Sequence, residues 1–275
     1  MDRAPLVLVT RPDRPGRLLA ARLRDAGSAS GVSALWWPAF DLVPLPDDPV
    51  LQASLARLAG FDLAVFVSPA AARACARALR APWPESTAIA AVGAGTRQAV
   101  LSCIPEAGRA RIVAPSDTAA AGGGSEALLS ALRRADLTPA RVLVVRAQRG
   151  RELLADALTK AGAQVEQVAA YRRVVHRPDS CAWAALRAIR DLDRPIVPFL
   201  SSSEGVDALR EQLDGEISPL PWNEIRVALC LHPRIAEALA ARGVADAIVC
   251  DADAESILDG LGAHGKPDRV HWPHE

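Results

Sequence analysis

"RVLVVRAQRGRELLADALTKAGAQVEQVAAYRRVV", residues 141–175, contains the pattern that decides the predicted fold. An apolar run at 141–146 leads into a helical pattern that ends at Gly162, and a stretch of alternating polarity follows. Short apolar strands that alternate with helices are typical of parallel sheets covered by helices on both faces. We therefore expect an α/β protein, because similar apolar runs precede helical patterns at 6–10, 63–68, 88–93, 111–115, 195–201, 225–231 and 246–250.

The first half of the chain resembles the second half. "LLAARLRDAG" (18–27) lies over "LLADALTKAG" (153–162) at an offset of 135 residues, and "FVS" (66–68) lies over "FLS" (199–201) at an offset of 133. We interpret the chain as a duplicated α/β unit. Chance similarity between βα units is the alternative, and the shared order of four successive units argues against it. The repeat does not say whether the two domains are consecutive along the chain.

At the same offset, Trp36 overlies Tyr171, the only tyrosine of the chain. The segments "WWPAF" (36–40) and "AAYRRVV" (169–175) each follow the first βα unit of their repeat, and both have extended character. Pro38 disfavours a helical conformation at Trp37. Two equivalent extended segments predict two crossings of the chain between two domains, with a cleft between the domains.

Composition limits the possible function classes. The 275 residues suit two domains, and the balance of 32 basic and 32 acidic residues does not indicate a nucleic-acid or membrane partner. Five cysteines without C-x-x-C spacing argue against a disulfide framework, and the histidines show no metal-ligand spacing. The first apolar run is too short for a signal peptide or a membrane span. We expect a cytoplasmic protein without a metal.

Ligands of open parallel sheets bind beyond the carboxyl ends of the strands. Hydroxyls, glycines and arginines at strand-to-helix turns suit an anionic ligand, because helix N-termini offer free N–H groups and a positive dipole end. The alternative is that the serines and threonines merely cap helices. The rule predicts a binding site formed by Thr10, Arg11, Ser68, Gly93, Thr96, Arg146, Ser201 and Ser202.

Two other motifs carry less weight. "VGAGTRQAV" (92–100) resembles a dinucleotide-binding loop, but Gln98 stands where the third glycine is needed, and the motif follows the third strand instead of the first. His232 lies in a predicted strand-end turn without an obvious carboxylate partner in the sequence. We interpret it as a solvent-facing helix cap.

Tyr171 has two interpretations. Tyrosine suits extended, half-buried segments, so it could simply fill space in a strand. A neutral phenol can also donate a proton or a hydrogen bond, and a crossing between domains would place it at a cleft. The predicted location therefore favours a catalytic Tyr171.

The chain resembles the uroporphyrinogen-III synthase family from about residue 6 to 261. Each motif is weak alone, and the set is fairly specific. The matching stretches are "VLVTRP" (7–12), "FDLAVFVSPAAARA" (61–74), "IAAVGAGTRQAV" (89–100), "SEALL" (125–129), residues 141–173, "PFLSSSEGVDAL" (198–209) and "LHPRIAEALAARG" (231–243).

The resemblance implies two similar α/β domains joined by two linkers, with one domain discontinuous. Its expected boundaries are 1–36 with 175–265 for the discontinuous domain, 41–169 for the inserted domain, 37–40 and 170–174 for the linkers, and 266–275 for a tail.

The implied reaction is the cyclisation of the linear tetrapyrrole hydroxymethylbilane, with loss of water and inversion of ring D, in haem biosynthesis. The resemblance implies a monomeric lyase that needs no cofactor or metal. Tyr171 matches the family tyrosine proposed as the general acid, and Ser68, Thr96, Ser201 and Ser202 match polar family positions. Ala70 departs from the polar or basic residue of many relatives. This departure leaves open a tetrapyrrole- or small-anion-binding protein of the same fold without activity.

Overall fold

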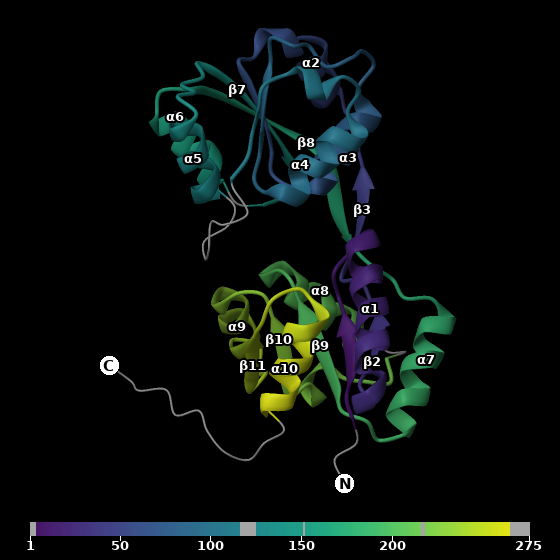
Figure 1. Ribbon diagram of the computed structural model, residues 1–275. Coiled ribbons are helices and arrows are strands. Elements are labelled where there is room, and N and C mark those ends of the chain that lie inside the picture. The colour runs from purple at the N-terminus through teal and green to yellow at the C-terminus, as the bar shows by residue number, and fades with distance from the viewer. Residues whose placement is uncertain (1–3, 116–124, 151, 216–217, 265–275) are drawn as a thin grey trace. The chain divides into compact units, whose positions relative to one another are not determined.

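The computed structural model describes residues 4–115, 125–150, 152–215 and 218–264, so the expected tail at 266–275 lies outside the described residues. The chain divides into two compact units, Met1–Asp41 with Val174–Glu275, and Leu42–Arg173 (Figure 1). Each unit contains a largely parallel sheet flanked by helices, which confirms the predicted fold class. Within the described ranges, no helix has the length and apolar character needed to cross a membrane.

The unit Leu42–Arg173 contains a sheet of order β3-β8-β7-β4-β5-β6. Its strands are β3 (Phe40–Pro44), β4 (Leu63–Phe66), β5 (Ala88–Ala91), β6 (Ile112–Val113), β7 (Arg141–Ala147) and β8 (Gln164–Val175). Its helices are α2 (Pro49–Ala56), α3 (Pro69–Ala78), α4 (Ala94–Cys103), α5 (Ser125–Arg134) and α6 (Leu153–Lys160). In Figure 1, α3 and α4 lie on one face of this sheet and α5 and α6 on the other.

The alternation of side chains along β4 divides the core of this unit into two layers. Ala64 and Phe66 pack toward α3 and α4, whereas Leu63 and Val65 pack toward α5 and α6. All four side chains are fully buried. Burying a large apolar side chain contributes about 1.5–3 kcal/mol, so a strand that is apolar on both sides stabilises both layers.

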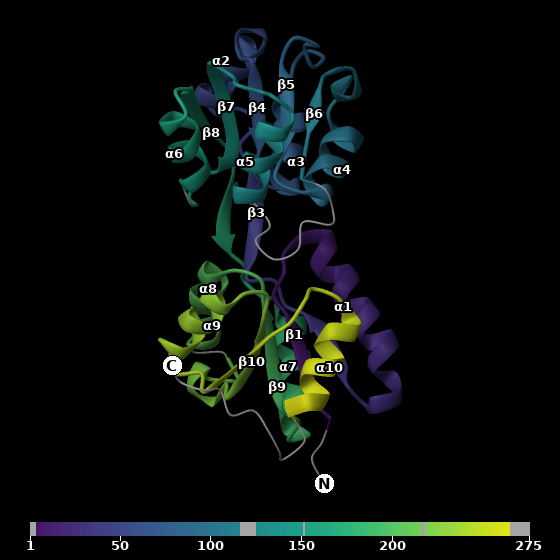
Figure 2. The same cartoon turned by 60° about the vertical axis from the view of Figure 1, so that its left-hand side comes forward.

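The other unit contains a sheet of order β11-β10-β9-β1-β2. Its strands are β1 (Leu6–Val9), β2 (Ser33–Trp36), β9 (Ile196–Leu200), β10 (Val227–Cys230) and β11 (Asp246–Val249). Its helices are α1 (Asp13–Gly27), α7 (Ser180–Asp191), α8 (Ser203–Leu213), α9 (Pro233–Ala240) and α10 (Ala254–His264). Figure 2 shows α8 and α9 on one face and α1 and α10 on the other, in agreement with the two core layers.

Five strands follow the same order in both sheets, and β3 is an additional edge strand in the sheet of the unit Leu42–Arg173. Read from one edge, β2-β1-β9-β10-β11 corresponds strand by strand to β8-β7-β4-β5-β6. The first two strands of each series come from one sequence repeat and the last three from the other repeat. Each unit therefore combines the βαβ segment of one repeat with three strands of its counterpart.

The chain passes from one unit to the other within β3 and within β8. Leu45 N–H donates to Ala170 O at 2.9 Å and His176 N–H donates to Ala39 O at 3.1 Å, an antiparallel pattern. β2 ends at Trp36 and β3 begins at Phe40, with Pro38 between them, whereas β8 is continuous from Gln164 to Val175. The two segments that the sequence makes equivalent thus differ in structure.

A buried amide holds both of these segments against α8. The Gln212 side chain accepts a hydrogen bond from Trp37 Nε1 at 2.8 Å, and its Nε2 donates to Pro38 O at 3.0 Å and to His176 O at 2.9 Å. Gln212 is only 7 % exposed. Its amide therefore satisfies polar groups that water does not reach.

Replacing Gln212 by leucine is expected to destabilise the unit that contains it by roughly 2–3 kcal/mol, because buried donors and acceptors lose their partners. Chemical denaturation followed by tryptophan fluorescence measures this change. The matched control is Gln98→Leu, at an exposed position of α4, for which we expect almost no change. Equal effects of the two substitutions would contradict the assigned role.

Candidate functional site

Tyr171 and Ser68 are in direct contact. Ser68 follows β4 and is the N-cap of α3, where its Oγ accepts a hydrogen bond from Ala71 N–H at 3.0 Å. The same Oγ lies 3.2 Å from Tyr171 Oη, so the two hydroxyls share a hydrogen bond. Ser68 thus acts as the predicted helix cap and also orients the only phenol of the chain.

A β-bulge determines which face of the sheet Tyr171 occupies. Arg146 pairs with Ala169, but Ala147 pairs with Tyr171, so Ala170 is the additional residue. Without the bulge, alternation would place Tyr171 on the opposite face of the sheet. With it, Tyr171 packs in the core layer beneath α3 and is only 3 % exposed.

Tyr171 lines a pocket of about 190 Å³ at the carboxyl ends of β7 and β4. Ser68, Arg146 and Arg149 also line this pocket, together with the apolar Val67. The phenol therefore stands between hydroxyl, cationic and apolar groups, a combination that suits an anionic ligand with an apolar body.

Arg146 is placed in this pocket but already has partners. Its guanidinium donates to Gln167 Oε1 and forms an ion pair with Glu152 at 3.8 Å. Its side chain is only 11 % exposed. Gln167, which sequence reasoning did not single out, shares both the pocket and this contact.

Gly93 and Thr96 belong to the next strand-to-helix turn. Gly93 is the N-cap of α4, and its carbonyl accepts hydrogen bonds from Thr96 N–H and Arg97 N–H, each at 3.0 Å. Gly93 has an extended conformation, and a β-carbon there would meet no atom within 4 Å. The turn therefore leaves open space above its backbone, whereas Thr96 is buried.

Thr10 and Arg11 lie at the carboxyl end of β1. Thr10 is buried, and its Oγ1 donates to Phe199 O at 2.7 Å, which ties β1 to β9. Arg11 O accepts a hydrogen bond from Trp36 Nε1 at 3.0 Å. A side chain at Gly16 would collide with Arg11 O, so only glycine fits beside this turn.

Burial lowers the pKa of the Arg11 guanidinium, because desolvation disfavours its charge. No ion pair to this guanidinium occurs among the described residues. An anion bound at Arg11 would therefore neutralise a positive charge with which no described residue forms an ion pair.

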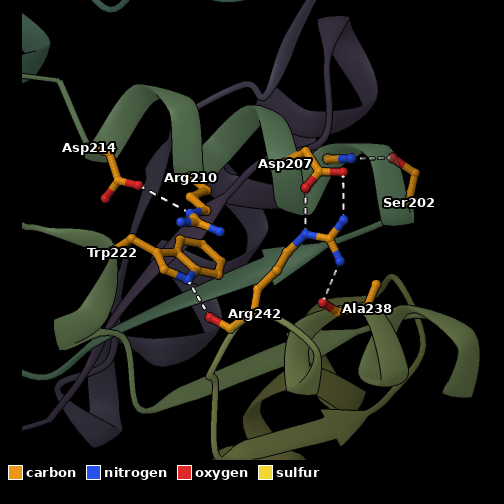
Figure 3. A network of polar contacts seen from close by, with 8 residues as sticks. Ser202, Asp207, Arg210, Asp214, Trp222, Ala238 and Arg242 are labelled. Carbon is orange, nitrogen blue, oxygen red and sulfur yellow. Dashed lines mark hydrogen bonds and ion pairs between the residues drawn. The ribbon is translucent and has the colours of Figure 1, made fainter.

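Ser201 and Ser202 lie at the carboxyl end of β9, beside β1. Ser202 is the N-cap of α8, with its Oγ accepting from Gly205 N–H at 3.1 Å. Farther along this helix, Asp207 accepts from Arg242, with 2.8 Å between Arg242 Nη2 and Oδ2 (Figure 3). Figure 3 also shows Arg210 paired with Asp214, so salt bridges support the helix behind the Ser202 turn.

His232 and Ala70 have structural environments. His232 is the exposed N-cap of α9, as expected, and its Nδ1 accepts from Arg234 N–H at 3.2 Å. Ala70 is half-buried against the core layer beneath α3. In the described residues, no three His, Cys, Asp or Glu side chains are grouped so that they could hold a metal ion.

The predicted residues thus fall into two groups, one in each unit. In one unit, Ser68, Gly93 and Thr96 follow β4 and β5, and Arg146 and Tyr171 lie within the neighbouring β7 and β8. In the other unit, Thr10, Arg11, Ser201 and Ser202 follow the adjacent strands β1 and β9.

A family model described as "Uroporphyrinogen-III synthase HemD" matches residues 20–261. The chain is 29% identical over 194 residues to the uroporphyrinogen-III synthase of Escherichia coli, covering 70% of this chain and 74% of that protein. It is 32% identical over 182 residues to the uroporphyrinogen-III synthase of Salmonella typhimurium, covering 65% of this chain and 69% of that protein.

Solved structures share the fold. A mutant uroporphyrinogen III synthase from the extremely thermophilic bacterium Thermus thermophilus aligns with a TM-score of 0.54 at 18% identity, covering 94% of this chain and 98% of that one. Uroporphyrinogen-III synthetase from Helicobacter pylori aligns with a TM-score of 0.55 at 14% identity, covering 95% and 99%.

Ser68 and Asp179 offer a matched test, because the side chain of each caps the N-terminus of a helix and only Ser68 contacts Tyr171. Alanine at either position is expected to cost about 1 kcal/mol of stability through the lost cap. Thermal unfolding measures this effect. Only Ser68→Ala also removes the partner of Tyr171. Only this substitution is therefore expected to lower turnover. Equal turnover of the two variants would show that the contact has no functional role.

Proposed function

The chain belongs to the uroporphyrinogen-III synthase family and is a hydro-lyase of tetrapyrrole biosynthesis, and from this premise we propose its substrate and the roles of its site residues. The proposed substrate is hydroxymethylbilane, a linear tetrapyrrole with carboxylate side chains. The proposed product is uroporphyrinogen III, in which ring D is inverted before the macrocycle closes.

We propose that Tyr171 is the general acid. Its Oη proton would pass to the terminal hydroxyl of the substrate, the C–O bond would break, and water would leave behind an azafulvene cation stabilised by the pyrrole nitrogen. The observation that carries this proposal is the contact between Tyr171 Oη and Ser68 Oγ at the wall of a pocket. The bond to Ser68 fixes the direction of the phenol before the substrate arrives.

The remaining steps require positioning more than chemistry. Ring D must attack through the substituted carbon to give a spirocyclic intermediate, which then opens and closes at the other carbon with loss of a proton. Simple end-to-end closure competes with this route, so the enzyme must favour a folded conformer of the substrate. The pocket beside Tyr171 combines an apolar wall with cations, which would suit pyrrole rings and carboxylates respectively.

We propose that the strand-end turns of both units bind the substrate carboxylates. Arg11 supports this role, because its partly desolvated guanidinium has no ion pair among the described residues. Gly93, Ser201 and Ser202 would contribute N–H and hydroxyl groups at helix N-termini. The buried Thr10 and Thr96 and the nearly buried Arg146 would act by holding their turns in place.

We also propose that residues 1–36 with 175–265, and 41–169, act as the two domains, with 37–40 and 170–174 as linkers. The division of the contacts into two compact units supports this proposal. A monomer is proposed because the large exposed apolar side chains are scattered over different elements. They are Leu18, Val50, Leu101, Leu153, Val174, Leu192 and Val249. A cytoplasmic location agrees with the free thiols of all five cysteines.

The isomer formed from hydroxymethylbilane tests the proposed reaction. We expect the purified protein to yield the type III isomer, resolved chromatographically after oxidation of the product. Formation of the type I isomer alone, which arises without an enzyme, would refute the reaction. It would instead favour a protein of this fold that binds tetrapyrroles without directing their closure.

Replacing Tyr171 by phenylalanine tests the general acid. Because the ring and its packing remain while the proton donor is lost, turnover should fall by at least about tenfold with little change in stability. The rate of type III formation measures the effect, and Trp83→Phe, in the same core layer, serves as a control for altered aromatic packing. An unchanged rate in Tyr171→Phe would assign catalysis to positioning alone.

A further inference from the structure

Two arginines at the carboxyl end of β7 line the pocket of Tyr171, but their environments differ. Arg146 is nearly buried, whereas Arg149 is exposed. We propose that Arg149 binds a substrate carboxylate and that Arg146 is a positioning residue that holds the loop carrying Arg149. This inference rests on the proposed function and assigns separate roles within the same site.

Arg146 already has two partners within the protein. It connects three elements, because it belongs to β7, donates to Gln167 of β8, and pairs with Glu152 before α6. Exchanging these contacts for a ligand is unfavourable, because breaking a contact of a nearly buried guanidinium leaves its charge poorly solvated. Its planar donor groups instead fix the start and end of the intervening loop.

The loop at 148–150 is held by its backbone. Gln148 N–H donates to Tyr171 O at 2.8 Å, which anchors the residue before Arg149 to β8. Gly150 has φ +155°, and a β-carbon there would lie 3.2 Å from Arg146 Nη2. Arg149 is therefore presented between two fixed points, one tied to Tyr171 and the other packed against Arg146.

The guanidinium of Arg149, unlike that of Arg146, is available to bind a ligand. In the described ranges, its guanidinium has no hydrogen-bond or ion-pair partner, whereas the third arginine of the pocket, Arg173, does have an interaction partner. Glu126 is an acidic side chain in the same lining, so the arginines outnumber it. An exposed guanidinium beside a fixed phenol suits bidentate binding of a carboxylate at the rim of the ligand.

Steady-state kinetics with hydroxymethylbilane separate the two roles. Arg149→Gln is expected to raise KM about tenfold with kcat nearly unchanged, because a charge-assisted hydrogen bond to the substrate is lost. Arg149→Lys should keep much of the affinity, since a point charge still attracts a carboxylate. Arg146→Lys should lose as much activity as Arg146→Gln, because an ammonium group does not reproduce the planar contacts of the guanidinium.

Salt dependence gives a readout that a merely structural role would not change. The KM of the wild-type enzyme should rise with ionic strength, because salt screens attraction between exposed charges. Arg149→Gln should weaken this rise, whereas Arg146→Gln should preserve it. The control Arg134→Gln, in the last turn of α5 at the opposite end of the sheet, should match the wild type in every parameter.

The outcomes distinguish this inference from the proposed function. If the wild type forms the type III isomer while Arg149→Gln keeps its KM and salt dependence, the role of Arg149 is refuted and the function stands. If the wild type forms only the type I isomer, the function itself fails. If Arg146→Lys retains full activity, the positioning role of Arg146 is refuted. If Arg146→Gln alone flattens the salt dependence, the two roles are assigned the wrong way round.

Discussion

The pairing of β1 with β9, and of β7 with β4, is the constraint on which the rest of the structure depends. Val9 lies opposite Phe199, and Thr10 adds a hydrogen bond from its hydroxyl to the Phe199 carbonyl. Val145 lies opposite Phe66 in the corresponding pair of the other sheet. Both pairings join strands from different repeats, so the chain must pass between the units twice. Contacts so distant in sequence carry a loop-closure cost that grows slowly with separation, and burial of the apolar strands helps to offset it.

This exchange of segments explains why the catalytic candidate lies where it does. β8 belongs to the exchanged βαβ segment, and it runs without a break from the sheet that holds Tyr171 to the residues bound by Gln212. The bulge at Ala170 then places the phenol in the same layer as Ser68. The position of the Tyr171 side chain thus depends on one local irregularity, the bulge, and on one long-range strand pairing.

Helix caps and arginines show how one residue type acquires different roles. Ser68 and Ser202 cap helices in the same way, yet only Ser68 has a phenol within hydrogen-bond distance. Arg146 and Arg149 are three positions apart, yet one is braced and nearly buried while the other is exposed. Residue type therefore selects candidates for a site, and the surroundings decide what each one can do.

The sequence by itself determined the α/β class, the duplication and the strand ends that hold the candidate residues, because these follow from local periodicity. It also identified the caps at Ser68 and His232. The residue pattern left open which repeat supplies each half of a sheet, since β1 could pair with β4 or β9 without any change in pattern. The tertiary structure pairs β1 with β9, as the family resemblance implied. It alone revealed the bulge beside Tyr171, the amide of Gln212 and the contrast between Arg146 and Arg149. These features depend on contacts between residues far apart in the chain, and a local sequence pattern does not specify such contacts.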